Sequence, residues 1–299
     1  MHIAFLGLGL IGGSVARAAG LAGYATRITA WTPRGAGPRA ATAVGIEAAS
    51  SAAGAIRGAD LIVLAAPPVA CLDLIDELGG ALRDDLAPDA VVTDVASTKG
   101  MIVARARERG LRFIGGHPMA GLESSGYGAA DPGMFRDRPW VVVPAEPEDD
   151  AADDRVMALA AACGARPIRM TAAAHDAAVA AISHVPLVLS AAIVEAMTDR
   201  PDWPVAAPLA AGGWASMTRL ARGQPAMGAG ILATNGPAIA ARLRDLQGVL
   251  GEWLELVERG EEAIDGVALE RRFAAAREHA FSGEAGGDGA GPGAAGAPE

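Results

Sequence analysis

Short apolar runs alternate with helix-like segments over the first 170 residues of this 299-residue chain. The runs are rich in β-branched residues and nearly continuous, which is typical of strands buried on both faces of a parallel sheet. They lie at residues 2–7, 27–31, 60–66, 90–95, 112–116 and 140–144, and a helical segment (12–22) follows the first. The pattern predicts an α/β domain with a parallel sheet covered by helices on both sides.

The pattern changes after Thr171, where the sequence is helical and strand-like runs stop. Thr171 is suited to cap a long helix that continues to about residue 200. Pro186 lies inside this stretch, and proline removes a backbone donor and clashes with the carbonyl four residues earlier. A kink is therefore expected near Ile182–Pro186. Further helices are expected over 206–222, 236–258 and 260–281, so the second part of the chain is predicted to be all helical.

A glycine-rich turn follows the first predicted strand. Gly7, Gly9 and Gly12 have G-x-G-x-x-G spacing, and Leu10 and Ile11 open the next helix. In a dinucleotide-binding turn the first glycine permits the tight turn, the second lets the backbone approach the pyrophosphate, and the third lets the helix pack on the strand. The helix N-terminus then faces the phosphates. A glycine turn without a ligand is the alternative, but its place between strand and helix favours an NAD(P)-binding Rossmann domain.

The residues after the strand at 27–31 should contact the cofactor's ribose. An acidic residue there, about 20 residues after the turn, would bind the ribose hydroxyls of NAD. The sequence instead has Thr32-Pro33-Arg34. A hydroxyl and a guanidinium suit the 2′-phosphate of NADP, so NADP is slightly favoured over NAD. The alternative is that Arg34 is a solvated loop residue.

These patterns divide the chain into three parts. An NAD(P)-binding Rossmann domain is predicted over 1–170, and a helical domain over 171–282. The last part, 283–299, is mostly Gly, Ala and Pro and has little apolar surface to bury, so it is expected to be disordered.

Composition narrows the possible partners and compartment. The net charge is −10 and no basic block stands out, which argues against nucleic-acid and anionic-membrane partners. Cys71 and Cys163 are the only cysteines and do not have metal-ligand spacing, so no metal site is expected and a reducing cytoplasm fits. The first 20 residues are apolar, but four glycines interrupt them and no Lys or Arg precedes them, which favours a folded strand and helix over a signal peptide.

Candidate catalytic residues follow two of the predicted strands. Ser97 and Lys99, the sole lysine, come after 90–95, and His117 comes after 112–116. The carboxyl ends of parallel strands meet at one edge, where open α/β sheets bind ligands. Gly115 and Gly116 are expected to clear space there for a nicotinamide or substrate ring. His117 is a candidate general base, against the alternative of a capped loop histidine. Ser97 could equally be a helix N-cap.

Four segments in the same order resemble the prephenate/arogenate dehydrogenase family of tyrosine and aromatic amino-acid biosynthesis. They are the glycine turn, TDVASTKG (93–100), GGHPMAGLESSG (115–126), and HDAAVAAISHVP (175–186) with GGWASMTRLA (212–221). The resemblance implies a Rossmann domain, a helical dimerisation domain, and a homodimer with its active site between the domains. It implies oxidation of prephenate to 4-hydroxyphenylpyruvate, or of arogenate to tyrosine, with loss of carbon dioxide and hydride transfer to NAD(P)+.

The resemblance also implies roles for particular residues. His117 would take the proton of the ring hydroxyl, and Ser97 would bind near that hydroxyl and the nicotinamide. His184 would lie in the active site, and Arg219 would bind a substrate carboxylate, as a planar guanidinium does bidentately. Lys99 would support the site by complementing local charge. Beyond these, the pair His175-Asp176 is expected to be structural, forming a helix-start hydrogen bond, and Glu123 to organise its loop.

The sequence departs from the family pattern in two places. Leu187 stands where many members have a second histidine, and 212–221 lacks the charged residues often found before the arginine. Both changes leave open whether the substrate is prephenate, arogenate or a related cyclohexadienyl compound.

Two other functions are compatible with parts of the sequence. A dehydrogenase of the β-hydroxyacid or 6-phosphogluconate type would need a lysine on the helical domain, but Lys99 lies elsewhere. A non-catalytic NAD(P)-binding sensor would be favoured by loss of His117 or Ser97, and both residues are present.

Overall fold

The computed structural model of the chain describes residues 1–121, 124–258 and 266–284. Packing divides the chain into two compact units, Met1–Leu243 and Arg244–Glu299. Most of the tail predicted to be disordered lies outside the described residues, and its first two positions end a helix. The domain boundary at residue 170 stays a prediction.

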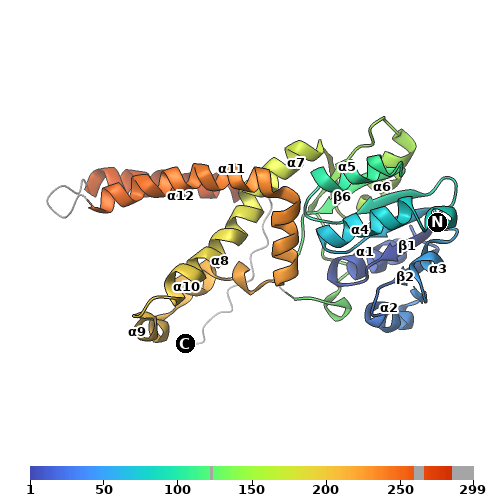
Figure 1. Ribbon diagram of the computed structural model, residues 1–299, viewed down its shortest axis with the longest axis horizontal. Coiled ribbons are helices and arrows are strands. Elements are labelled where there is room, and N and C mark those ends of the chain that lie inside the picture. Colours follow the sequence, from blue (N-terminus) through green and yellow to red (C-terminus); the bar gives the residue numbers. More distant parts are fainter. Residues whose placement is uncertain (122–123, 259–265, 285–299) are drawn as a thin grey trace, which may run out of the picture. The chain divides into compact units, whose positions relative to one another are not determined.

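The first unit contains an eight-stranded sheet with the order β3-β2-β1-β4-β5-β6-β7-β8. Figure 1 shows the sheet among helices α1 to α6. The part from β3 to β6 is parallel throughout and has the Rossmann strand order, which confirms the predicted fold. The strands are β1 (His2–Leu6), β2 (Arg27–Trp31), β3 (Glu47–Ala48), β4 (Leu61–Leu64), β5 (Val91–Asp94), β6 (Phe113–Pro118), β7 (Pro139–Val143) and β8 (Arg166–Arg169). The short edge strands β3 and β8 had no clear pattern in the sequence.

The direction of β7 differs from the prediction. The run at 140–144 was expected in the parallel sheet, but β7 pairs antiparallel with β6, and β8 is parallel to β7. Parallel neighbours need a crossover, usually a helix, that returns the chain to the opposite edge. The described residues between β6 and β7 contain only a 3-10 turn, η3 (Tyr127–Ala129), so the chain enters β7 from the edge at which β6 ends.

Helices on both faces of the sheet bury two apolar cores, as predicted. The helices of the sheet region are α1 (Leu10–Leu21), α2 (Ala36–Ala41), α3 (Ala52–Ile56), α4 (Pro68–Gly79), α5 (Gly100–Glu108) and α6 (Asp150–Ala162), with 3-10 turns η1 (Thr42–Val44) and η2 (Arg83–Asp85). Val15 of α1 and Val156 of α6 pack on one face. Ile56, Ile75 and Ile102, from α3, α4 and α5, pack on the other. This burial holds the strand ends in fixed register, which positions the site described below.

The helical stretch after Thr171 begins and breaks where the sequence predicted. The Thr171 hydroxyl accepts a hydrogen bond of 3.2 Å from Ala174 N, and α7 (Ala172–Val179) follows. A π-helical turn, η4 (Ala180–His184), separates α7 from α8 (Val185–Thr198). The wider turn occurs next to Pro186, which cannot donate its own helical hydrogen bond. The irregularity thus falls at the expected kink and places His184 at its end.

The whole run Ala172–Thr198 is apolar enough and long enough to cross a membrane by length and composition, with a hydropathy of 2.1 in its most apolar window. Helices of soluble proteins can meet the same criterion, so this is weak evidence for a membrane span.

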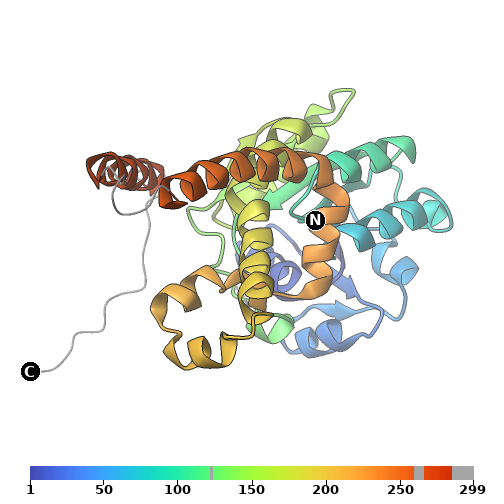
Figure 2. The same cartoon turned by 60° about the vertical axis from the view of Figure 1, so that its left-hand side comes forward.

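The single helix predicted over 206–222 is wrong. This region forms a series of short helical segments, drawn in gold in Figure 2. They are α9 (Trp203–Ala206), η5 (Ala207–Leu209), α10 (Gly212–Met217) and η6 (Leu220–Arg222). Pro208 and the pair Gly212-Gly213 interrupt the helical pattern, because proline removes a donor and glycine costs backbone entropy. The next helix, α11 (Pro225–Glu258), starts earlier than the predicted 236 and contains a non-helical residue, Asn235.

The second unit contains the end of α11 and helix α12 (Gly266–Glu284). Arg272 pairs with Glu252 at 2.8 Å and lies 4.4 Å from the centre of the Trp253 ring. Phe273 packs on the same ring, yet it remains 64% exposed, and Leu254 is 58% exposed. This unit therefore presents apolar side chains to its surroundings.

Candidate functional site

The glycine turn between β1 and α1 is closely packed at two positions and open at the third. Gly7 has φ +104°, and a Cβ there would lie 2.2 Å from Ala65 O at the end of β4. A Cβ on Gly12 would lie 2.7 Å from both Ala65 Cβ and Gly7 O. A Cβ on Gly9 would meet nothing within 4 Å among the described residues. The turn therefore fits a dinucleotide: two glycines form it, the third leaves room for a pyrophosphate, and α1 begins at Leu10 with its first amides facing that room.

Two arginines lie in the loop after β2. Thr32 Oγ1 accepts a hydrogen bond of 3.0 Å from Gly35 N, which closes a turn around the exposed Arg34. Arg39, also exposed, donates from Nη2 to Arg34 O at 3.0 Å. The predicted cationic residue is thus accompanied by a second arginine that the sequence pattern did not single out. The two guanidiniums make this loop suitable for a phosphate group.

A buried ion pair lies between the end of β5 and the start of α5, and its carboxylate is also bonded to β6. Lys99 Nζ bonds to Asp94 Oδ2, and both side chains are fully buried. Asp94 also accepts hydrogen bonds of 3.0 Å from Ala96 N and from Gly116 N, the residue before His117. Burial raises the pKa of Asp94, although Lys99 and the two amides oppose that shift. Lys99 therefore acts here through a carboxylate that anchors the strand carrying His117.

Gly115 and Gly116 lie where a side chain would clash with the protein itself. A Cβ on Gly116 would lie 2.4 Å from Asp94 O and 3.3 Å from Trp140 Nε1. A Cβ on Gly115 would lie 3.1 Å from Val143 Cβ and 3.2 Å from Lys99 Cδ. The protein's own neighbouring strands fill the space, so the prediction that these glycines clear room for a ligand ring is wrong. They let β6 fit closely between β5 and β7.

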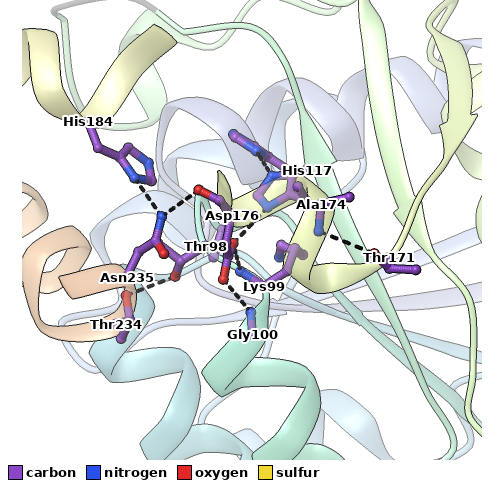
Figure 3. A network of polar contacts seen from close by, with 12 residues as sticks. Thr98, Lys99, Gly100, His117, Thr171, Ala174, Asp176, His184, Thr234 and Asn235 are labelled. Atoms are coloured by element: carbon purple, nitrogen blue, oxygen red, sulfur yellow. Dashed lines mark hydrogen bonds and ion pairs between the residues drawn. The ribbon is translucent and has the colours of Figure 1, made fainter. Parts of the chain in front are cut away.

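His117 belongs to a chain of hydrogen bonds that crosses from β6 to α7 (Figure 3). Its Nδ1 lies 2.8 Å from His175 Nε2, and His175 Nδ1 lies 2.8 Å from Asp176 Oδ1. Asp176 also accepts from Lys99 N at 2.8 Å and Gly100 N at 2.7 Å. Among the described residues, His117 Nε2 has no hydrogen-bond partner, and His117 keeps some solvent exposure while His175 is 1% exposed.

Two expectations change because of these hydrogen bonds. The helix-start hydrogen bond predicted for His175-Asp176 exists, but the helix that Asp176 caps is α5, and His175 contacts the candidate base. Ser97 is not the N-cap of α5; that position is Lys99, whose own side chain makes no capping hydrogen bond. A carboxylate from another helix takes the place that a local hydroxyl was expected to fill.

The two ends of this hydrogen-bond chain, His117 and Asp176, favour different charge states. Desolvation, together with the neighbouring His175, Lys99 and His184, holds the pKa of His117 well below its usual range. Burial alone would raise the pKa of Asp176, but its hydrogen bonds from His175, Gly100 N and Lys99 N hold that pKa below its usual range. At neutral pH His117 is therefore a neutral imidazole and Asp176 a carboxylate.

Asn235 connects this chain to His184. Its Nδ2 donates to Asp176 O at 2.9 Å and lies 3.1 Å from His184 Nδ1. Its φ of −132° breaks the helical backbone of α11, and the preceding Thr234 bonds to Thr98 at 2.8 Å. The break thus brings an amide to the histidines. An Asn-Gly-Pro sequence within a helical pattern is a turn signal that could have identified it.

Two buried polar atoms near the histidines lack a partner in the described structure. They are His184 Nε2 and Ser97 Oγ. Burial lowers the pKa of His184 to about 4, although Asp176 and the backbone of Ser97 oppose this shift. Buried polar atoms are normally hydrogen-bonded, so each of these is suited to a bound polar group.

Arg219 and Leu187 both lie in the helical part of the chain. Arg219 precedes η6, and the neighbouring Ala221 N donates to Ser190 Oγ of α8 at 2.9 Å. The turn that carries Arg219 is thereby tied to the helix that follows His184. Leu187 lies in α8, and Glu123 falls outside the described residues.

Comparisons with known proteins agree with this architecture. Residues 16–169 match the family model described as prephenate dehydrogenase, nucleotide-binding domain, and residues 171–269 match prephenate dehydrogenase, dimerization domain.

The chain is similar to several named relatives. It is 29% identical over 286 residues to prephenate dehydrogenase of Bacillus subtilis, covering 93% of this chain and 74% of that enzyme. It is 32% identical over 230 residues to 4-amino-4-deoxyprephenate dehydrogenase of Streptomyces pristinaespiralis, covering 71% and 68% of the two chains. The solved structure of Synechocystis arogenate dehydrogenase superposes with a TM-score of 0.76 at 28% identity, covering 93% and 99%.

Proposed function

This chain belongs to the prephenate dehydrogenase family, and on that premise we propose how its residues divide the work of the reaction. The protein is an NAD(P)-dependent dehydrogenase that oxidatively decarboxylates a cyclohexadienyl acid. The β-hydroxyacid and sensor alternatives are not favoured.

His117 is the general base. The observation that carries this role is the bond between its Nδ1 and His175, which leaves Nε2 as the ring nitrogen free to contact a substrate. A neutral imidazole can accept the proton of the ring hydroxyl as the hydride leaves the carbon that bears this hydroxyl. The lowered pKa of His117 keeps it neutral. Loss of the ring carboxylate as carbon dioxide makes the ring aromatic, so the protein mainly positions the substrate.

The glycine turn holds the cofactor. Gly9 and the first amides of α1, at Leu10 and Ile11, face the pyrophosphate, while Gly7 and Gly12 keep the turn closed. Bound NAD(P)+ supplies the hydride acceptor. Thr32, Arg34 and the additional Arg39 favour the 2′-phosphate of NADP modestly, because two exposed cations lie where an NAD-specific enzyme would have an acid.

The substrate's polar groups are held on the helical side. Arg219 binds a carboxylate, which needs a local cation because the chain is acidic overall. The unpartnered atoms Ser97 Oγ and His184 Nε2 bind the ring hydroxyl, the nicotinamide amide or a substrate carboxylate.

The relatives differ in one polar group of the substrate. The relatives are named for prephenate, arogenate and 4-amino-4-deoxyprephenate, which share the cyclohexadienyl ring and differ in one polar group each. Leu187 gives this chain an apolar residue where a second histidine is common. We place prephenate first and arogenate second.

The protein functions as a cytoplasmic homodimer. Support comes from the matched dimerization domain and from exposed apolar residues on the second unit, such as Leu254 and Phe273. Exposed apolar surface of this kind commonly marks an interface.

The test is an absorbance assay of nicotinamide reduction with four pairings: prephenate or arogenate, each with NAD+ or NADP+. Reduction with release of carbon dioxide in at least one pairing is expected. The absence of turnover in every pairing, from folded dimeric protein, would overturn the assignment of substrate class.

A further inference from the structure

We infer that His175 and Asp176 form a proton relay behind His117: they fix which nitrogen of His117 is the base and take over the positive charge that proton abstraction creates. The inference rests on the proposed role of His117 and adds two residues whose contribution the sequence pattern did not indicate.

The hydrogen-bond chain determines the tautomers from its far end. The Asp176 carboxylate accepts two backbone amides and has no proton to offer, so His175 Nδ1 must carry the hydrogen in their 2.8 Å bond. Neutral His175 then has a lone pair on Nε2. His117 Nδ1 must therefore be the donor in the 2.8 Å bond between the rings. The lone pair of neutral His117 is left on Nε2, the nitrogen that remains free for the substrate.

The proton steps balance along this chain. The substrate O–H bond breaks and its proton joins His117 Nε2. The Nδ1–H bond of His117 breaks and that proton joins His175 Nε2, so His117 is again neutral and His175 is a cation beside the Asp176 carboxylate. The two electrons and the hydrogen of the oxidised C–H bond leave as hydride to the bound cofactor, as the family reaction requires. Return of the protons along the same path, through the partly exposed His117, resets the base.

The surroundings explain why the charge should move away from His117. The titratable groups that act on the His117 ring are His175 of α7, His184 of η4 and Lys99, and each would oppose a positive charge there. His184 would also oppose a positive charge on His175. His175, however, contacts the Asp176 carboxylate directly. Asp94 is engaged by Lys99. Asp176 is thus the carboxylate available to balance the new charge within this cluster.

Replacement of His175 separates a relay from a purely structural role. His175→Phe removes both the tautomer restraint and the proton acceptor, and His175→Gln retains an acceptor for His117 Nδ1 without a group that can take up the proton. We expect kcat to fall about tenfold or more in His175→Phe and less in His175→Gln, with KM nearly unchanged. The acid limb of the kcat profile should move to higher pH in both, because each variant removes a neighbour that holds the pKa of His117 down. His279→Gln, the same change on an exposed helix position, is the matched control.

A second measurement does not depend on turnover. Nitrogen NMR of the five histidines in cofactor-free wild-type protein reports which ring nitrogen of each carries hydrogen. Hydrogen on Nδ1 of both His117 and His175 supports the relay, and hydrogen on Nε2 of neutral His117 overturns it even if the His175 variants fail to fold. Wild-type kcat and acid limb in both His175 variants, alongside an inactive His117→Asn, would reject the relay and leave the base intact. An active His117→Asn would instead reject the proposed function itself.

Discussion

The glycine turn and the histidine cluster lie in the same compact unit and are built in different ways. The turn uses the backbone of adjacent residues, from Gly7 to Gly12, and its tight contacts are with the end of the neighbouring strand β4. The cluster uses side chains from separate segments, with His117 bonded to a residue 58 positions later and Asn235 to one 59 positions earlier. A backbone site can thus be recognised by spacing alone, whereas a side-chain site exists only once β6, α7 and α11 have been packed together.

The difference also predicts how each region tolerates substitution. In the turn, the outcome depends on whether an added Cβ meets protein or open space. In the cluster, it depends on protons and charges, so isosteric changes should be harmful while the fold survives.

The largest effect should come from the candidate base in the cluster. His117→Asn keeps a polar side chain but cannot accept the hydroxyl proton, so kcat should fall by about 10²–10⁴-fold. Cofactor affinity, measured by fluorescence titration, should stay close to wild type because the glycine turn is untouched. A variant with nearly normal turnover would show that another group is the base.

Two single changes in the turn should separate folding from binding. Gly7→Ala forces a Cβ to within 2.2 Å of Ala65 O at positive φ and should destabilise the protein by about 2 kcal/mol or more. Gly9→Ala meets open space, so its melting temperature should match wild type while affinity for the dinucleotide falls about tenfold. Equal nucleotide affinity in Gly9→Ala and wild type would contradict a pyrophosphate at this position.

Acid should destabilise the protein through His184 of the cluster. The pKa of His184 is lowered from 6.5 to about 4, so below pH 6.5 the unfolded chain binds a proton that the folded state resists. Stability should therefore fall as pH drops from 6.5 toward 4, by roughly 3 kcal/mol from this group. Urea unfolding at several pH values, compared with His184→Gln, measures it. A variant whose stability falls as steeply as wild type in this window would assign the loss to other groups.

A smaller effect is expected at Arg219, which precedes η6 in the helical part of the chain. A bidentate contact with a carboxylate has a geometry that an ammonium cannot reproduce. Arg219→Lys and Arg219→Ala should both lower kcat/KM by about tenfold or more without altering cofactor affinity. If Arg219→Ala retains normal substrate kinetics, a different group holds the carboxylate.

The smallest effect should be at the loop after β2, beside the turn. Arg34→Ala and Arg39→Ala should each weaken NADP binding by a few-fold, roughly the value of one solvated charge-assisted contact, and leave NAD unchanged. The ratio of the two dissociation constants is the measurement. Equal losses for NADP and NAD, or a wild-type preference for NAD, would refute the predicted selectivity.

Two of the failed predictions depended on neighbours that are distant in the sequence. The run at 140–144 was correctly identified as a strand, but its direction depends on the lack of a helix crossover in the described residues between β6 and β7. Gly116 was recognised as a place without bulk, but the space around it belongs to Asp94 and Trp140 and is not open to a ligand. The sequence shows that a residue is small, and only its neighbours in the fold show what requires the small residue.

The amino-acid sequence by itself determined most strands of the parallel sheet, the glycine turn, the Thr171 cap and the break near Pro186, because each has a recognisable pattern within a few residues. It also singled out His117 through the motif around it. The tertiary structure decided that His175 and Asp176 stand behind His117, that Asp176 caps α5, and that Lys99 is neutralised by Asp94. These contacts join distant segments, and hydrogen-bond geometry and burial, which set protonation, arise only when those segments pack.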